Sequence, residues 1–287
     1  MITIIKINSD KKFRTKKTME LKSTNYQIIK ASNHQISKST NLQINKIVFI
    51  FYFLIFVFLF SSCKKTDTFI SPAIADYFPL QSGKYITYHL DSIVYKSFGT
   101  RDTTISYEVK YLTDSLTTDN LGRPAWRIFR FIRKESSQPW IPDASFMAIN
   151  TGTRLEFIEN NLRYVKLQLP IQNDFSWKGN SFIDTYSAYS QVRYLDNWDY
   201  VYANVDGPDN VGTYTLDSTL TVNQRDEVIG LPDQPDSYSE KNFSQEKYAR
   251  GIGMIYRKFF HSEYQPSNGG YFADGSYGVT YTMIDHN

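Results

Sequence analysis

From Tyr77 onward, apolar and polar residues alternate in short segments, and this alternation limits the fold of the chain more than any other feature. In the segment 105–111, isoleucine, tyrosine and valine occupy the odd positions, and serine, glutamate and lysine the even ones. A period of two places one face of a segment against a core and the other toward water, as in a β-strand. Aromatic and β-branched residues, which are frequent throughout this region, also favour strands.

Several other segments carry the same signature. The segment 213–222 alternates more loosely, and a last strand is expected at 277–283. Asn160-Asn161 separates two short apolar runs, and because asparagine tolerates positive φ, this pair predicts a hairpin turn. Further strands are expected at 84–96, 125–133, 144–150, 198–204 and 252–260.

Glycine, proline and asparagine fall between these segments, and no long stretch keeps the 3.6-residue period of a helix. Ser237 and Glu240 fit a capping box, which predicts one short helix over 237–248. No change in composition divides residues 77–287, so they are expected to form a single domain. The sequence therefore predicts an all-β fold, an antiparallel meander of roughly nine to eleven strands that forms an open curved sheet or barrel, with at most one or two short helices.

The charge of the chain is divided between two regions. Residues 1–62 contain ten Lys or Arg and two Asp or Glu, whereas residues 63–287 contain 22 basic and 27 acidic residues. The overall charge of +3 therefore hides a mildly acidic domain. Because that domain has no basic stripe that would follow a phosphate backbone, no nucleic-acid partner is expected.

Cys63 is the only cysteine of the chain, and it follows soon after an apolar run. Residues 47–60 are fourteen apolar residues without a charge, and Lys46 precedes them. As a helix this run would span about 21 Å, whereas a hydrocarbon core is about 30 Å thick. A short apolar run after basic residues is typical of a signal peptide, here residues 47–62. A single cysteine also excludes an internal disulfide and a multi-cysteine zinc site.

Ser61 and Ser62 immediately precede Cys63, and together with the apolar run they resemble the lipobox of bacterial lipoproteins. In that family the cysteine sulfur receives a diacylglycerol, and cleavage before the cysteine makes it the new N-terminus. One departure is Phe60, where the family usually has leucine or another aliphatic residue. The resemblance implies lipidation of Cys63. The alternative is an uncleaved membrane anchor with residues 1–46 in the cytoplasm.

The residues on both sides of this signal add two expectations. The stretch 64–67 is charged and resembles the export tag of surface lipoproteins in the Bacteroidetes, and no aspartate directly follows Cys63 as an inner-membrane retention signal. Both features favour an outer-membrane anchor, with the periplasmic or cell-surface face left open. Residues 63–76 are then expected to be a lipidated tether.

Residues 1–46 form a basic low-complexity extension, which contains an eight-residue repeat at 23–46 and is expected to be disordered.

The domain itself shows a second resemblance. The segment 77–80, Tyr-Phe-Pro-Leu, followed by Gly83 and an aromatic strand, opens many Bacteroidetes lipoproteins of unknown function. The segments 248–253, 263–266 and 284–287 are similar to the C-terminal part of the same group. This resemblance implies a β-rich fold in the periplasm or at the cell surface, and it implies no activity.

The motifs that would carry chemistry are incomplete. His261 and Glu263 would lie on one face of a strand, but they supply only two metal ligands. Residues 251–253 lack the third glycine of a dinucleotide-binding loop, so tight packing of strands is expected at that segment. Residues 274–278 lack the first glycine of a nucleophile elbow, so a turn is expected there. Residues 206–210 hold oxygen donors suited to calcium, but their composition also predicts a turn. No catalytic residue, metal or cofactor is therefore predicted.

Four tryptophans are the candidate ligand-binding residues: Trp126, Trp140, Trp177 and Trp198. Exposed aromatic side chains form platforms for sugar rings or apolar ligands, although most aromatic residues of an all-β domain pack in the core. Trp140 is the main exception, because prolines flank it in an expected loop. A tryptophan there would either cover one end of a barrel or contact a partner.

The export signal, the aromatic strands and the lack of a catalytic constellation favour one class of function. The sequence predicts a membrane-anchored lipoprotein, held by lipid on Cys63, whose domain is a non-catalytic binding or envelope-assembly module. A glycan, an apolar ligand or an envelope protein is the expected partner. The alternative is an envelope hydrolase that acts on glycan or lipid through a carboxylate pair that no motif marks. Two carboxylates converging in a cleft, one of them desolvated, would favour the hydrolase, whereas an aromatic cavity would favour binding.

Overall fold

The computed structural model describes residues 49–51 and 70–287. Cys63, the eight-residue repeats and most of the apolar run lie outside these residues. Residues 70–287 form a compact unit. Within the described ranges, no helix is both long and apolar enough to span a bilayer.

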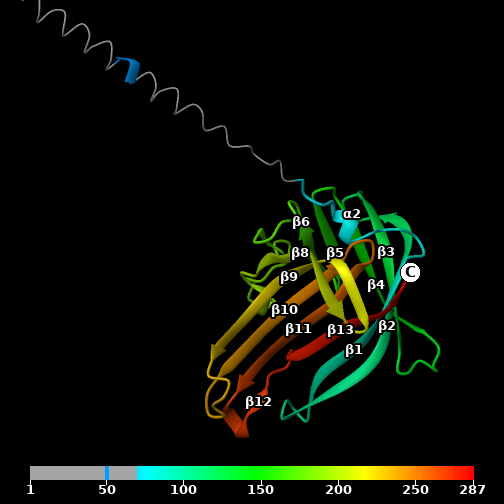
Figure 1. Ribbon diagram of the computed structural model, residues 1–287. Coiled ribbons are helices and arrows are strands. Elements are labelled where there is room, and N and C mark those ends of the chain that lie inside the picture. The colour runs from blue at the N-terminus through cyan, green and yellow to red at the C-terminus, as the bar shows by residue number, and fades with distance from the viewer. Residues whose placement is uncertain (1–48, 52–69) are drawn as a thin grey trace, which may run out of the picture. The chain divides into compact units, whose positions relative to one another are not determined.

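Thirteen strands of this unit form one antiparallel sheet (Figure 1). The strands are β1 (Tyr85–Lys96), β2 (Arg101–Thr118), β3 (Pro124–Arg133), β4 (Ile141–Asn150), β5 (Arg154–Glu159), β6 (Leu162–Gln168), β7 (Ser176–Lys178), β8 (Asp199–Val211), β9 (Tyr214–Gly230), β10 (Ser239–Ala249), β11 (Gly253–Gln265), β12 (Tyr271–Phe272) and β13 (Tyr277–His286). The helical elements described in this unit are α2 (Ile74–Tyr77) and two 3₁₀ turns, η1 (Arg193–Leu195) and η2 (Ser267–Gly269). The predicted all-β fold is confirmed.

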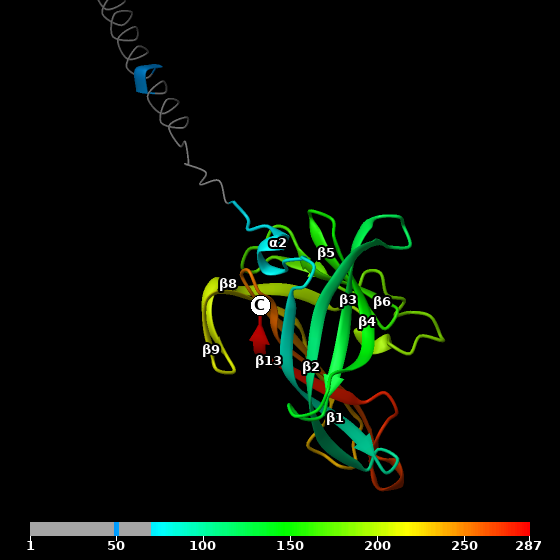
Figure 2. The ribbon, with the colours of Figure 1, turned by 90° about the vertical axis from the view of Figure 1, so that its right-hand side faces the viewer.

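The order of strands in the sheet is β6-β5-β4-β3-β2-β1-β13-β11-β10-β9-β8-β7, and β12 pairs with β11. Most neighbours in this order are also neighbours in sequence, because short turns join antiparallel strands. The C-terminal strand β13 is the exception, since it pairs with β1 on one side and with β11 on the other. β13 therefore joins the two halves of the meander, and Figure 2 shows the curl that brings these halves to face each other.

The two edge strands come together and nearly close the sheet into a barrel. The Val165 amide on β6 donates to the carbonyl of Gly179, just after β7, at 2.7 Å. The Trp177 indole on β7 donates to the Val165 carbonyl at 2.8 Å. Gly179 suits this seam, because a Cβ at that position would lie 2.2 Å from the Tyr200 ring. These contacts satisfy backbone groups that an open edge would leave exposed.

Aromatic rings form a connected row in the core. Tyr88 packs edge to face on Tyr111 and Tyr281, with ring centroids 5.3 and 5.7 Å apart. Phe146 continues the row beyond Tyr111, again at 5.3 Å. Such contacts add about 0.5–1.5 kcal/mol each to the stabilisation from buried area. The Tyr88 hydroxyl donates to the Met254 carbonyl at 2.7 Å, which satisfies the polar end of this ring.

Most predicted strands are confirmed, but the predicted helix over 237–248 is wrong. β10 occupies that segment and pairs with β9 and β11. Its buried face carries Asn242, Ser244 and Glu246, so the apolar alternation that marks a strand is missing. Backbone hydrogen bonds to a strand on each side override the local capping-box signal. The predicted hairpin turn at 160–161 is confirmed, because both asparagines have positive φ between β5 and β6.

A short N-terminal segment packs at the end of the sheet where β10 turns into β11 (Figure 2). Ile74 and Tyr77 of α2 are buried in the core. The Asp76 carbonyl accepts a hydrogen bond from the Gly251 amide at 2.7 Å, and the Tyr77 hydroxyl donates to Asp206 at 2.5 Å. The compact unit therefore begins inside the expected tether, and α2 is part of the domain.

Candidate ligand-binding cavity

The curved sheet surrounds two cavities that share a wall of charged side chains. The smaller cavity has a volume of about 50 Å³ and lies beside Phe78, just after α2. The larger cavity has a volume of about 570 Å³ and lies beside Trp198. Glu159, Lys166 and Arg257 line both. Because one water needs about 10–15 Å³, the smaller cavity suits a few waters, whereas the larger one has the size of an organic-ligand site.

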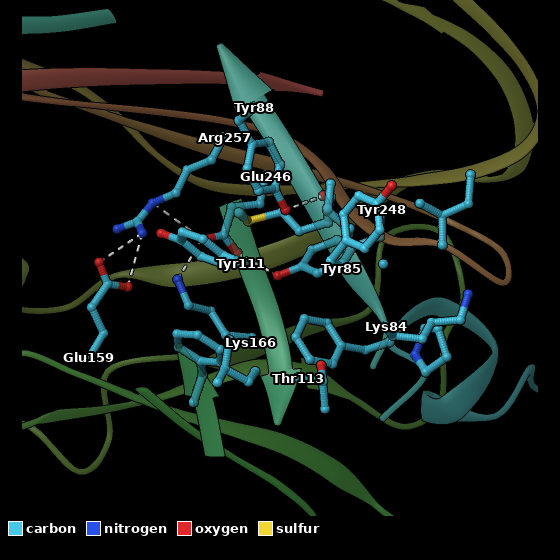
Figure 3. Close-up of a pocket in the computed structure, with 18 residues that line it drawn as sticks. Lys84, Tyr85, Tyr88, Tyr111, Thr113, Glu159, Lys166, Glu246, Tyr248 and Arg257 are labelled. Carbon is cyan, nitrogen blue, oxygen red and sulfur yellow. Dashed lines mark hydrogen bonds and ion pairs between the residues drawn. The ribbon is translucent and has the colours of Figure 1, made fainter. Parts of the chain in front are cut away.

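The shared wall belongs to a buried group of two acids and two bases, here called the ionic cluster: Glu159, Lys166, Glu246 and Arg257. Lys166 Nζ lies 2.5 Å from Glu246 Oε1, and Arg257 Nη1 donates to both Glu159 oxygens at 2.9 Å. Arg257 Nε lies 3.6 Å from Glu246 Oε1, so the four charges form one chain. The Tyr248 hydroxyl donates to Glu246 Oε2 at 2.6 Å. Figure 3 shows the four side chains pointing toward one another.

Two pairs of strands position the ionic cluster from different parts of the sheet. Glu246 on β10 and Arg257 on β11 are direct partners in the antiparallel register. Glu159 ends β5 and Lys166 lies on β6, and these strands are distant from β10 and β11 in the strand order. The Lys166–Glu246 and Glu159–Arg257 pairs therefore cross the interior, and they form only because the sheet curls.

Burial and pairing together set the protonation of the ionic cluster. Burial acts to raise the pKa of Glu159, but the facing charges of Arg257 and Lys166 hold that pKa below its ordinary value. Burial lowers the pKa of Lys166, and the Glu246 carboxylate offsets this only in part. Burial also opposes the charged form of Arg257, but its two glutamates hold its pKa well above the ordinary value. Glu159 and Arg257 therefore stay ionised.

This arrangement does not supply the acid of a carboxylate-pair hydrolase. Such enzymes keep one carboxyl group protonated near neutral pH, so that it can protonate the leaving group. Glu159 is desolvated, but Arg257 holds it ionised. Glu246 accepts hydrogen bonds from Lys166 and Tyr248. The interior carboxylates thus balance the interior cations, and the larger cavity is the feature that indicates a function.

One wall of the larger cavity is aromatic. Trp198 and Phe259 have ring centroids 6.1 Å apart at an interplanar angle of 29°, and Phe259 and Tyr277 lie 4.9 Å apart at 28°. Trp198 lies just before β8, Phe259 on β11 and Tyr277 at the start of β13. Much of the remaining lining is polar and includes Asp184 and Ser244, together with three members of the ionic cluster, Glu159, Lys166 and Arg257. Aromatic surface combined with a few polar groups is the usual composition of a ligand site.

The larger cavity reaches the surface between the β5–β6 turn and the loop that follows β7. Its lining includes the exposed residues Asn160, Asp184, Tyr189 and Gln191. Tyr189 is 90% exposed, so its ring stands free at the rim. A ligand can therefore enter without separation of the strands.

Two buried donors at the larger cavity have no partner among the residues that the structure describes. They are Gln224 Nε2 on β9 and Arg257 Nε on β11, and the latter faces Glu246 Oε1 at 3.6 Å, beyond hydrogen-bond distance. Ser244 orients the Gln224 amide, because its hydroxyl donates to Gln224 Oε1 at 2.5 Å. A buried donor without a partner costs about 1–3 kcal/mol.

Two of the four candidate tryptophans lie near the interior. Trp198 lines the larger cavity, and its indole donates to the Tyr194 carbonyl at 2.7 Å. Trp177 is buried at the seam between β6 and β7, where its ring centroid lies 4.5 Å from that of Tyr202. Of this pair, Trp198 alone belongs to the lining of the larger cavity.

The other two candidate tryptophans lie outside that lining. Trp126 is partly buried on β3. Trp140 is partly buried just before β4, with the Arg133 guanidinium 4.2 Å and the Lys110 ammonium 5.1 Å from its ring centroid. Such cation–π contacts already use the ring surface that a partner would need. The four tryptophans therefore do not form one site.

Residues 206–210 lie in a bulged part of β8, so the expected turn is wrong. The pairing of β8 with β9 shifts register on both sides of Gly207, as a β-bulge requires. Asp206 pairs with Arg250 at 2.7 Å, and Asp209 pairs with Lys247 at 2.6 Å. Both carboxylates therefore already have a cation as partner.

The remaining motifs have structural partners. His261 Nδ1 lies 2.7 Å from Asn242 Oδ1, and its ring stacks on Tyr194 at 3.8 Å. Residues 250–252 form the tight turn between β10 and β11, Gly253 begins β11, and residues 274–275 form the expected turn before β13. Across the described residues, no group of three or more His, Cys, Asp or Glu side chains is arranged to hold a metal ion.

Sequence reasoning missed the ionic cluster. Each member is a single charged residue in a strand, and its partner comes from far along the chain. Lys166 and Glu246 are 80 residues apart, and Glu159 and Arg257 are 98 apart. The polar buried face of β10 was the one local signal, because it leaves polar groups in the core that require partners.

Comparisons with known proteins leave the function open. No family model matches the chain, and no curated protein matches it. Among solved structures, it is similar to the crystal structure of a Bacteroides fragilis protein that is thought to be exported and has a YmcC-like fold. The two are 10% identical with a TM-score of 0.36, and the alignment covers 74% of this chain and 98% of the other. The cavity therefore carries the functional inference.

Proposed function

We propose that the chain is a lipid-anchored envelope protein whose β-domain binds a small ligand in the larger cavity. The cavity carries the proposal, because it combines a volume of about 570 Å³ with an aromatic wall and a polar remainder. Ligand pockets have about 300–1,000 Å³ and a similar composition. A sheet with a purely structural role would fill this space with side chains, since protein interiors pack as densely as organic crystals.

The ionic cluster supports the same proposal. The ionic cluster provides a fixed wall, because its cross-interior pairs hold β5 and β6 against β10 and β11. A preformed site of this kind lowers the cost of ordering on binding.

Native mass spectrometry of the full-length chain, extracted from its own envelope in mild detergent, tests the cavity proposal. The wild-type chain is expected to carry a bound mass that denaturation releases. Ser244→Phe places a ring in the cavity and should abolish this mass. Gln245→Phe is the matched control, because the Gln245 side chain bonds Asn223 on the exposed face of β10.

Either of two results would overturn the cavity proposal: a wild-type chain without any bound mass, or Ser244→Phe that retains it. If Ser244→Phe does not fold, Leu162→Trp narrows the same lining at a partly exposed position. It should lower the occupancy of the bound mass while Gln245→Phe leaves it unchanged.

The anchor is proposed from the signal: an apolar run at 47–60 followed by Ser61, Ser62 and Cys63. We place the lipid on Cys63 and the protein at the outer membrane. Growth with an alkyne-labelled fatty acid should label the wild-type chain and the Ser62→Ala control. Cys63→Ala should take up no label, and labelled Cys63→Ala would exclude this anchor.

A further inference from the structure

The last part of β9, residues 225–230, has a neighbouring strand on one side alone, and this segment is here called the open edge. We propose that the open edge pairs in antiparallel orientation with the open edge of a second copy of the chain, with Val228 on the two-fold axis. The sheets of the two copies then continue into each other. The free backbone groups, the exposed side chains and the charges of the open edge carry this inference, and the larger cavity plays no part in it.

The open edge exists because β9 extends past the start of β8. Among the described residues, the pairing of β8 with β9 begins at Asn223, whereas β10 stays paired with β9 as far as Gly230. Figure 1 shows the end of β9 at the margin of the sheet, beside β10. Val228 and Ile229 are 56% and 45% exposed, so the open edge is accessible to another chain.

The backbone groups of every second residue of the open edge point away from β10. Just beyond the two strands, the Leu231 amide donates to the Tyr238 carbonyl at 3.2 Å, which places the odd-numbered residues of the segment toward β10. The pairing with β10 has no register shift from Arg225 onward. The amides and carbonyls of Asp226 and Val228 therefore face outward, because the direction alternates along an antiparallel strand. Such a row is a template for an added strand.

The side chains of the open edge do not prevent pairing. Lysine, proline and bulges commonly protect edge strands, but residues 225–230 contain no lysine or proline. Arg225 and Glu227 satisfy each other, since Arg225 Nε donates to Glu227 Oε2 at 3.1 Å. Val228 and Ile229 present apolar surface on opposite faces of the strand. A partner strand can therefore cover both faces without stranding a charge.

Charge and hydrogen bonding select one register between two copies. With Val228 opposite Val228, Asp226 faces Gly230, which has no side chain, and Glu227 faces Ile229. Registers shifted toward the start of the strand place Glu227 opposite Glu227, or Asp226 opposite Asp226, and like charges directly opposite are destabilising. The next register toward the end pairs Asp226 with the first proline after the strand, which has no amide to donate. The open edge is therefore self-complementary, as a two-fold interface requires.

Disulfide cross-linking of the full-length chain in mild detergent tests the register. Opposite residues of a hydrogen-bonded antiparallel pair have Cα atoms about 5.5 Å apart, which a disulfide can bridge. Val228→Cys should therefore form a covalent dimer under mild oxidation, visible on a non-reducing gel. Ile229→Cys is the matched control, because its two copies would lie about 8 Å apart, beyond the reach of a disulfide. The wild-type chain, which contains Cys63, gives the baseline.

Native mass spectrometry of the full-length chain tests association without a cross-link. The wild-type chain is expected as a dimer. Val228→Pro removes an amide that β10 does not use, and it should raise the Kd of the dimer about ten- to hundredfold. Val228→Thr keeps the amide and should keep the dimer. If Val228→Pro does not fold, Val228→Asp places two carboxylates opposite each other at an exposed position and should give monomers.

Three results would overturn the proposal. The first is a monomeric wild-type chain, and the second is a dimer that Val228→Asp leaves intact. The third is a complex with a different protein that Val228→Asp abolishes, because the open edge would then dock another partner in place of a second copy. Preferential cross-linking of Ile229→Cys would overturn the register. None of these results depends on a ligand in the larger cavity.

Discussion

Lys166 Nζ lies 2.5 Å from Glu246 Oε1, and this pair joins β6 to β10 across the interior of the sheet. The two side chains are 6% and 0% exposed. Their strands stand far apart in the strand order, so the pair forms only when the two halves of the meander face each other. The pair therefore holds the two halves of the sheet together, and through Lys166 it also forms part of the wall that the two cavities share.

Glu246→Gln should destabilise the domain, because it leaves the Lys166 ammonium buried without a counter-charge. Removal of one partner of a buried ion pair costs about 3–5 kcal/mol, which urea unfolding can measure. The double variant Lys166→Met/Glu246→Leu removes both charges and should recover most of the loss. If Glu246→Gln lowers the free energy of unfolding by less than about 1 kcal/mol, the pair contributes no more than an exposed ion pair does. That result would contradict the claim that the pair is buried and stabilises the fold.

Glu156 should stabilise the fold at neutral pH and lose this effect in acid. The Glu156 side chain is 0% exposed, and this burial acts to raise its pKa. Arg123, Arg163 and Arg154 bind the carboxylate and outweigh burial, so they hold its pKa at about 2, below the ordinary 4.5. A lowered pKa means that the stabilisation is complete above about pH 4.5 and is lost as the pH falls toward 2.

The comparison of wild type with Glu156→Gln measures this contribution. The difference in free energy of unfolding should be about 2 kcal/mol at pH 6, because water screens the partly exposed arginines, and it should shrink steadily below pH 4.5. The exposed Glu135→Gln serves as control and should change stability by less than about 0.5 kcal/mol throughout. If the difference in free energy of unfolding between wild type and Glu156→Gln grew as the pH fell, this would contradict a lowered pKa of Glu156.

Gly179→Ala should open the seam between the edge strands. The added Cβ would lie 2.2 Å from the Tyr200 ring, beside the carbonyl that accepts from the Val165 amide. Such overpacking costs about 1–3 kcal/mol in thermal or urea unfolding. In a Tyr200→Ala background the same substitution should cost much less, and equal costs in both backgrounds would refute the steric cause.

Tyr77→Phe should loosen the N-terminal segment from the sheet. The Tyr77 hydroxyl donates to Asp206 at 2.5 Å, and Asp206 is also bound by Arg250. Loss of a hydrogen bond to a partly exposed charged group costs about 1–2 kcal/mol, which lowers Tm by about 3–6 °C in a domain of this size. Tyr107→Phe is the control, because that ring packs under the Lys134 ammonium, and it should leave Tm nearly unchanged.

The predictable part of the fold consists of strands whose buried face is apolar. The alternation at 105–111 lies within β2, and the paired asparagines at 160–161 form the turn before β6. Hydrophobic pattern and turn chemistry are local, so they can be identified without knowledge of the partners. β10 escaped prediction because its interior face carries Asn242, Ser244 and Glu246, and polar inward residues make sense only beside their partners.

The sequence predicted one residue of the candidate site, but it did not predict how the site is arranged. Trp198 was a candidate on residue type alone, and it does line the larger cavity. Apart from the polar buried face of β10, Gln224 and the ionic cluster carry no local signal, because their partners lie on other strands that are distant in sequence. Closure of the sheet creates the site, and closure is a property of the whole strand order.

The most direct test of ligand binding is a crystal structure of the full-length chain as extracted from its envelope. We expect continuous density for a non-protein molecule in the larger cavity, whose lining includes Trp198, Ser244 and Tyr277. Ordered waters alone in that cavity, in a chain that still keeps the Lys166–Glu246 pair, would contradict the assignment of a ligand-binding function.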